Sequence, residues 1–195
     1  MKLYIRSLSL SLIVLVFGLS ACTGKRTGNP SGNINVALPK LQTASLPDLG
    51  PAPELNNKVW LNTDAPLHLS DLRGKVVGLE MWTFECINCQ HVMPSLKRWY
   101  AAYKDQGFVI IGNHYPEFSQ EADLTNLKNA VALDGIEYPV AQDNDGETWN
   151  AYQNMYWPAL YLIDKRGRIR YVHFGEGAYD EIETNIKALL AEAYP

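Results

Sequence analysis

Cys86 and Cys89 are the residues whose type and spacing point most directly to chemistry. They follow an apolar run over residues 76–82 and precede a pattern typical of a helix over residues 87–104. Two thiols with this spacing at the first turn of a helix can close a small disulfide ring. The helix dipole and its unpaired N–H groups favour the thiolate of the first cysteine, the form that attacks another disulfide. We therefore expect a redox-active disulfide in which Cys86 attacks and Cys89 resolves the mixed disulfide.

One pair of this kind is also half of a zinc site. Zinc needs four ligands, and the sequence has no second CxxC motif and no closely spaced pair of His and Cys residues. We expect no metal, and no cofactor other than the disulfide Cys86–Cys89.

Glu80 is an acid inside an otherwise apolar strand. Side chains alternate along a strand, and continuing that alternation toward Cys86 places Glu80 on the cysteine side. Burial would raise its pKa and make it fit to exchange a proton with Cys89. The alternative is a salt-bridged or partly exposed acid.

The elements that must position these residues form an alternating pattern from residue 55 onward, which is typical of an α/β domain. The expected strands are residues 59–61 and 67–69 as a hairpin, 75–82 and 108–112 as buried strands, 138–140 as a short edge strand, and 159–164 and 169–174 as a second hairpin. The expected helices are residues 87–104, 119–133, 147–153 and 179–193.

Several motifs in order resemble the thioredoxin superfamily. They are Trp82, the cysteine pair, Pro94 inside the helix pattern, and Pro158 at the start of a sheet strand. Residues 75–89, 143–147 and 160–167 resemble the TlpA/ResA-type extracytoplasmic branch, and residues 82–89, 116–118 and 156–159 look most like the thioredoxin-like module of DipZ proteins.

This resemblance covers about residues 58–190 and implies a thioredoxin fold, a central mixed sheet flanked by helices, with an added N-terminal β-hairpin and a helix–strand insertion. It implies that Pro158 is cis and lies against the cysteine pair, and that Glu80 matches the family's buried acid. It also implies a substrate groove lined by Trp82, Trp157 and Pro158.

The first residues read as an export signal. Lys2 and Arg6 precede an apolar stretch over residues 8–19 that is too short to span a bilayer. Leu19-Ser20-Ala21-Cys22 then resembles a bacterial lipobox, which implies a signal peptide over residues 1–21 and lipidation at Cys22. An ordinary signal peptide is the alternative. Residues 22–54 suit a flexible tether, rich in Gly, Asn, Pro and Ser, and residues 55–195 a single thioredoxin-like domain.

The net charge and the expected location limit the classes of partner. Without residues 1–21 the chain has 15 basic and 21 acidic residues, because the removed part holds two basic residues and no acid. This acidic balance argues against nucleic acid. We expect a protein anchored by lipid to the outer side of a bacterial membrane, on the periplasmic side in a Gram-negative host. Its expected partners are exported proteins with thiols or disulfides, apocytochrome c among the candidates, and a membrane protein that supplies electrons. Glu85 and Glu80 disfavour a stabilised thiolate, which favours a reductant or an isomerase.

Two other functions remain open. A thiol peroxidase of the peroxiredoxin type would have a threonine at the position of Thr83, but Leu79 stands where that family has proline. A copper-handling chaperone would use the cysteines and a histidine such as His173, although such proteins usually place three residues between their cysteines. His114 suits either the groove or the surface.

Overall fold

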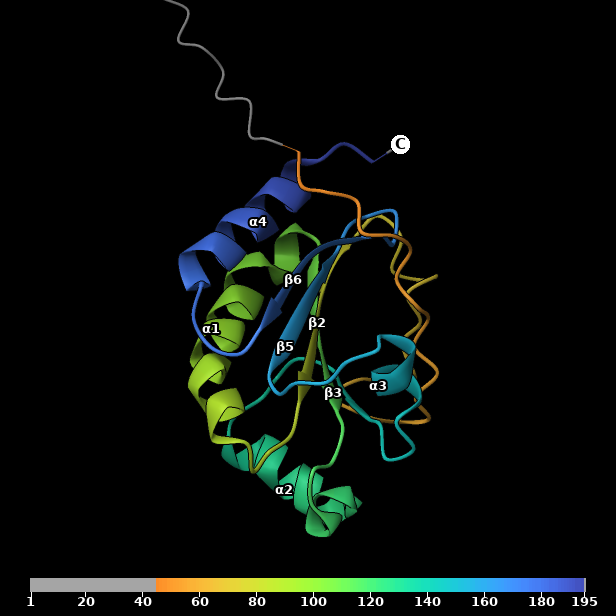
Figure 1. Ribbon diagram of the computed structural model, residues 1–195, viewed down its shortest axis with the longest axis vertical. Helices are drawn as coiled ribbons and strands as arrows, with labels where there is room; N and C mark the ends of the chain where they lie inside the picture. Colours follow the sequence, from red (N-terminus) through yellow and green to blue (C-terminus); the bar gives the residue numbers. More distant parts are fainter. Residues whose placement is uncertain (1–44, 195) are drawn as a thin grey trace, which may run out of the picture. The chain divides into compact units, whose positions relative to one another are not determined.

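The computed structural model describes residues 45–194, which form a six-stranded mixed sheet with helices on both faces (Figure 1). The strand order is β1-β4-β3-β2-β5-β6. The strands are β1 (Val59–Leu61), β2 (Val76–Trp82), β3 (Phe108–His114), β4 (Val140–Gln142), β5 (Ala159–Ile163) and β6 (Ile169–Phe174). The α-helices are α1 (Ile87–Tyr103), α2 (Leu124–Leu133), α3 (Glu147–Ala151) and α4 (Tyr179–Ala191), and two short 3-10 helices are η1 (Lys104–Gln106) and η2 (Ser119–Ala122).

The two central strands are buried on both faces, which explains their nearly continuous apolar sequence. Strand β2 runs parallel to β3 and antiparallel to β5. Because β2 and β3 are parallel, their carboxyl ends meet at one end of the sheet. The segments that follow them, residues 83–86 and 115–121, are therefore brought together there.

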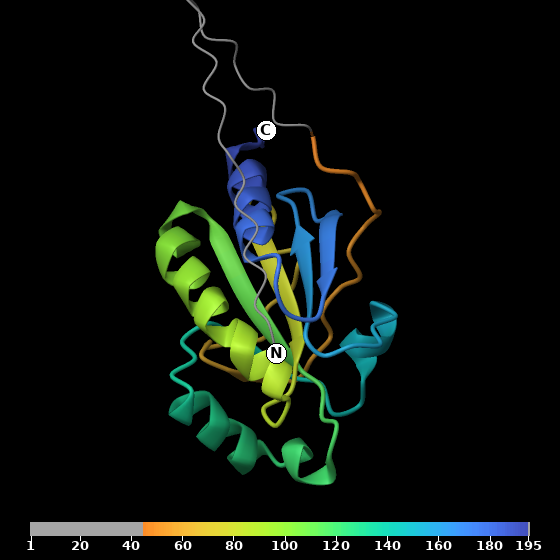
Figure 2. The same cartoon turned by 60° about the vertical axis from the view of Figure 1, so that its left-hand side comes forward.

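Each face of the sheet has its own apolar core. Helices α1 and α4 cover one face, together with residues of α2 (Figures 1 and 2). The other face is covered by α3 and by the chain between residues 52 and 72. The sheet thus separates two hydrophobic layers. Helix α1 packs on one face of the sheet, and its first turn lies at the end of the sheet where β2 ends.

The expected central mixed sheet flanked by helices is confirmed, but three local expectations are wrong. Residues 67–69 form no strand, and β1 pairs antiparallel with β4 instead of forming a hairpin with them. Strand β4 therefore lies inside the sheet, not at its edge. The expected helix over residues 119–133 is interrupted at Asp123, whose extended backbone and side chain cap the N-terminus of α2.

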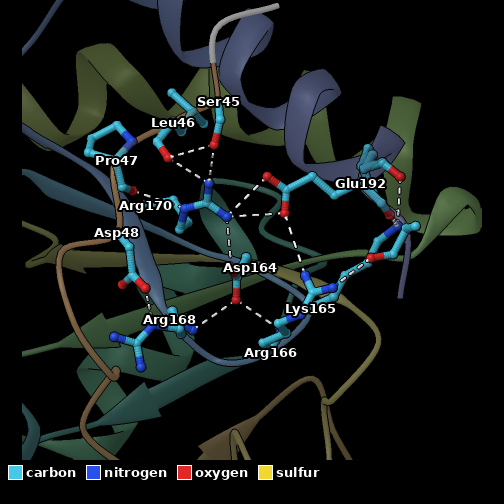
Figure 3. A network of polar contacts seen from close by, with 12 residues as sticks. Ser45, Leu46, Pro47, Asp48, Asp164, Lys165, Arg166, Arg168, Arg170 and Glu192 are labelled. Carbon is cyan, nitrogen blue, oxygen red and sulfur yellow. Dashed lines mark hydrogen bonds and ion pairs between the residues drawn. The ribbon is translucent and has the colours of Figure 1, made fainter. Parts of the chain in front are cut away.

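The segment that precedes the domain is attached to the sheet, although the sequence assigns it to the tether. Leu49 donates its N–H to the Ile169 carbonyl over 2.9 Å, and Ile169 donates to the Gly50 carbonyl over 2.9 Å. The Arg170 guanidinium also binds the carbonyls of Leu46 and Pro47 over 2.6 and 2.9 Å (Figure 3). Residues 45–50 therefore behave as part of the domain.

Arg170 is the centre of this attachment. It is almost buried and contacts Asp164 at 3.0 Å and Glu192, beyond the end of α4, also at 3.0 Å (Figure 3). Strands β2 and β5 pair with Val77 opposite Ile163 and Met81 opposite Ala159. This register puts Asp164 at the start of β2, and the cysteine segment at its other end. The Arg170 network and the cysteines therefore occupy opposite ends of the sheet. Among residues 45–194, no helix is long and apolar enough to cross a membrane.

Candidate active site

The cysteine pair lies at the N-terminus of α1, as the sequence predicts. Cys86 is the N-cap residue, and its sulfur accepts the backbone N–H of Cys89 over 3.4 Å. No disulfide joins the two cysteines in this structure. Cys86 is partly exposed, whereas Cys89 is only 1% exposed and belongs to the core under α1. The two sulfurs therefore differ in access: a partner can reach Cys86 but not Cys89.

Glu80 lies beneath this pair, on the face of the sheet that α1 covers. It is 3% exposed and no hydrogen bond to its carboxyl group occurs within residues 45–194. Burial raises the pKa of Glu80 well above its usual range. Burial and then the neighbouring Glu80 also raise the pKa of the Cys89 thiol. The expectation that Glu80 faces the cysteine side is correct, and the salt-bridged alternative is wrong.

A small cavity adjoins Glu80. Its volume is about 20 Å³, close to the space that one water molecule needs. It is lined by Pro158 and His173, by Gly175 and Gly177 from the loop after β6, and by apolar side chains of α1 and α4. The carboxyl group therefore adjoins a small, mainly apolar cavity on the Pro158 side.

Pro158 is preceded by a cis peptide bond, in agreement with the resemblance stated above. Its carbonyl accepts the Gly175 N–H over 2.8 Å, which joins the start of β5 to the loop after β6. Trp157 is half-buried and its indole N–H donates to the Tyr115 carbonyl over 3.2 Å. Its ring packs on Trp149 and Tyr115, with centroids 4.4 and 5.9 Å away. Three aromatic side chains thus hold the segment that enters the cis bond.

Trp82 does not line a groove, contrary to the sequence-based expectation. It is 1% exposed, at the end of β2, and it packs edge-on against His114 at 5.2 Å between centroids. Its indole N–H has no hydrogen-bond partner within the described residues. The close approach of this indole explains the glycine at position 112, where a Cβ atom would lie 2.8 Å from the Trp82 Nε1. Trp82 therefore acts as packing beneath the site.

The sequence reading missed a buried polar group beside the cysteines, formed by Thr83, His114 and Glu121. The Thr83 hydroxyl contacts His114 Nε2 at 3.2 Å and donates to the Glu121 carboxylate. All three residues are inaccessible to solvent, so His114 lies neither in the groove nor at the surface. The acids at the start of the 119–133 pattern look like ordinary helix-terminus residues, and only the approach of β2 and β3 brings Glu121 to Thr83.

The other sequence-based expectations concern His173, metal binding and the N-terminal segment. His173 is partly exposed, and its Nε2 contacts the Glu176 carbonyl at 3.2 Å. No group of three or more His, Cys, Asp and Glu side chains suited to a metal ion occurs in residues 45–194. The expected lipidation site, Cys22, and the expected signal peptide lie outside the described residues.

An accessible thiol at a helix terminus, a buried second thiol and a buried carboxyl group beside it suit thiol–disulfide exchange. The AhpC/TSA family matches residues 50–172. The chain belongs to the AhpC/TSA family.

The chain is also similar to individual proteins. The chain is 46% identical over 155 residues to the protein DipZ of Mycobacterium bovis, covering 78% of this chain and 22% of DipZ. It thus spans about a fifth of the length of that relative. It is 28% identical to the thiol-disulfide oxidoreductase YkuV of Bacillus subtilis, covering 73% of this chain and 95% of YkuV.

A solved structure of a thioredoxin-like superfamily protein matches with a TM-score of 0.70 and 33% identity, covering 75% of this chain and all but 1% of the other. These likenesses confirm the thioredoxin fold and the thioredoxin-like branch of the AhpC/TSA family.

Proposed function

We propose that this protein is held to a bacterial membrane by a lipid on Cys22 and exchanges disulfides with exported proteins outside the cytoplasm. The observation that supports it most is the asymmetry of the two sulfurs. Cys86 is partly exposed at the start of α1, and Cys89 is buried beside Glu80. The Cys86 sulfur is therefore accessible to a partner, and the Cys89 sulfur is shielded from it.

The reaction runs in two steps. The Cys86 thiolate attacks one sulfur of the partner's disulfide, forms a mixed disulfide and releases the partner's other sulfur as a thiolate. Cys89 then loses its proton and attacks Cys86, which releases the partner's second sulfur and leaves the disulfide Cys86–Cys89. The partner gains two electrons and takes up two protons from solvent, and the enzyme dithiol gives up the same number of each.

Glu80 is proposed to relay the proton that Cys89 loses: the protonated carboxyl group first gives its own proton to a water molecule in the adjoining cavity, and the carboxylate left behind then takes the proton from Cys89. Burial raises the pKa of both groups, so the buried carboxylate binds a proton far more readily than an exposed one does. The cavity beside Glu80 has room for a water molecule that would exchange this proton with solvent.

Trp157 and Pro158 are proposed to hold the partner's backbone beside Cys86. Met155 and Tyr156, just before them, expose 71% and 53% of their surface, and Ile87 between the cysteines exposes 59%. Apolar side chains exposed around a reactive thiol suit a partner that is unfolded or partly folded.

We propose a reducing or isomerising direction. The charges placed near the cysteines by Glu85 and Glu121 are negative, and no basic side chain forms an ion pair with either of them within residues 45–194. Negative charge disfavours the thiolate and therefore disfavours the reduced form. A membrane protein that supplies electrons would then restore the dithiol, and apocytochrome c is one candidate substrate.

Trapping tests the function directly. Full-length protein with Cys89→Ser should hold its partner as a mixed disulfide on Cys86, to be identified by mass spectrometry. Cys86→Ser is the matched control, because its remaining sulfur is buried and should trap nothing. Wild-type protein should also reduce insulin disulfides. Absence of both trapping and insulin reduction would contradict the proposal, and tight stoichiometric Cu(I) binding without turnover would support the copper chaperone instead.

The peroxidase remains a second candidate because the chain belongs to the AhpC/TSA family. The structure disfavours it at one position: the Thr83 hydroxyl hydrogen is given to Glu121 and is not free for a peroxide bound at Cys86. Rapid consumption of hydrogen peroxide by the wild-type protein, with loss in Cys86→Ser, would reverse this preference.

A further inference from the structure

Glu121, in η2, has a fully buried side chain that reaches the segment before Cys86. One carboxylate oxygen accepts the Thr83 hydroxyl and, over 3.0 Å, the backbone N–H of Glu85. The other accepts the backbone N–H groups of Glu117 and Phe118 over 2.7 and 2.8 Å. A single side chain thus satisfies four donors.

These bonds join two loops that are far apart in the sequence. Thr83 and Glu85 belong to the turn between β2 and α1, and the Thr83 carbonyl accepts the N–H of Cys86 over 3.4 Å. Glu117 and Phe118 belong to the loop after β3. Gln120 adds a second link from that loop, because its amide donates to the Glu85 carboxylate over 2.7 Å. The position of the Cys86 turn therefore depends on the loop after β3.

The proton positions in this group follow from the donors available. A carboxylate only accepts, so the one hydroxyl hydrogen of Thr83 goes to Glu121. His114 Nε2 must then be the protonated nitrogen that donates to Thr83, and its Nδ1, which has no partner within the described residues, is unprotonated. Burial lowers the pKa of His114 to about 4, so the ring is neutral near pH 7.

Glu121 itself is ionised. Burial acts to raise its pKa, but the hydrogen bonds from Thr83 and from the N–H groups of Phe118, Glu85 and Glu117 outweigh burial, and the pKa is lowered. Because the neighbouring imidazole is neutral, it does not cancel this charge. No Lys or Arg side chain forms an ion pair with Glu121 in residues 45–194.

We propose that Glu121 is a positioning residue for Cys86, which fixes the Thr83–Glu85 turn and keeps a negative charge behind the attacking sulfur so that the cysteine pair is a reductant. This proposal rests on the thiol–disulfide exchange proposed above. It makes two separable predictions, because hydrogen bonding determines the geometry of the turn and the charge affects the redox equilibrium.

The test uses two substitutions that change charge and geometry to different degrees. Glu121→Gln keeps the length of the side chain and removes the charge, but its amide nitrogen no longer accepts two of the four donors. At equilibrium with glutathione, where two glutathione thiols reduce one protein disulfide, the constant should shift about tenfold toward the protein dithiol. This corresponds to about 30 mV in the oxidising direction. Glu121→Asp keeps the charge but withdraws the carboxylate from the turn. It should leave this equilibrium within twofold of wild type and lower kcat/KM for insulin reduction at least tenfold.

Asp164 provides the matched control at the other end of the sheet. It is a buried carboxylate that accepts the N–H groups of Arg166 and Arg168, each over 2.9 Å, and pairs with Arg170 (Figure 3). Asp164→Asn should lower the melting temperature while leaving the glutathione equilibrium and kcat/KM unchanged. This control shows what loss of a buried structural carboxylate does by itself.

The outcomes are distinct. If Glu121→Gln lowers stability as Asp164→Asn does but leaves the glutathione equilibrium within twofold of wild type, Glu121 is structural only and the proposal is overturned. If Glu121→Gln does not fold, Glu121→Asp still decides, since an unchanged kcat/KM would refute the positioning role. Failure of the protein both to trap a partner and to reduce insulin would instead refute the proposed function. The glutathione equilibrium could still be measured in that case, because it needs no protein substrate.

Discussion

Replacing Glu80 by glutamine should stabilise the domain, and the gain should grow with pH. Burial raises the pKa of Glu80 in the folded protein far above its unfolded value of 4.5. Above pH 4.5 the unfolded chain therefore releases a proton that the folded chain retains. The free energy of unfolding of the wild type then falls by up to about 1.4 kcal/mol for each pH unit, relative to the variant. Below pH 4.5 both states hold the proton and the difference should be constant.

The measurement is urea unfolding of both proteins at pH 4, 5, 6 and 7. The difference between their free energies of unfolding removes the contribution of all other titrating groups, because both proteins share them. Parallel pH curves would refute the claim that Glu80 is buried without a compensating partner. Glu183→Gln is the control, because its difference from wild type in the free energy of unfolding should change with pH in the opposite direction. The hydrogen bonds from Tyr103 and Lys187 lower the pKa of Glu183 to about 2, so its contribution to stability is present above pH 4.5 and lost on acidification.

Three further substitutions test the packing and attachment of the domain. Arg170→Ala leaves Asp164 buried without its cation and should cost about 3–5 kcal/mol of unfolding free energy; hydrogen exchange at the Leu49 amide should also accelerate, and protection equal to wild type would refute the attachment. Gly112→Ala places a Cβ atom 2.8 Å from the Trp82 Nε1 and should cost about 1–3 kcal/mol, so a wild-type melting curve would count against the geometry. Trp149→Ala removes the ring that packs on Trp157 and should cost about 3–5 kcal/mol in urea unfolding, together with slower insulin reduction; unchanged turnover would show that the aromatic cluster does not support the site.

The sequence was sufficient for the chemistry of the cysteine pair, because that chemistry is local. Spacing and helical pattern place Cys86 at a helix N-terminus, and strand alternation places Glu80 on the cysteine side, as the structure has them. The central strands were also predictable. A strand buried on both faces is apolar throughout, and this pattern does not depend on which strands lie beside it.

Other features depend on which strands become neighbours, and no local pattern encodes that. The pattern of residues 67–69 predicts a hairpin partner for β1, whereas β1 pairs with β4, about eighty residues away. Trp82 looked like part of a groove, but its indole lies over Gly112 of the adjacent strand. The composition of residues 45–50 is typical of a linker, whereas Arg170 donates hydrogen bonds to the carbonyls of Leu46 and Pro47 and attaches this segment to the domain.

Local sequence therefore determined the reactive thiols and the buried acid, since each follows from the spacing of residues within one helix or one strand. The alternation of strands and helices along the chain determined the α/β class. Tertiary structure alone decided what surrounds them. The parallel pairing of β2 and β3 brings the turn before Cys86 against Glu121, thirty-eight residues beyond Thr83. A buried carboxylate is recognisable only by the donors that it meets, and those donors come from a loop that the sequence places far away.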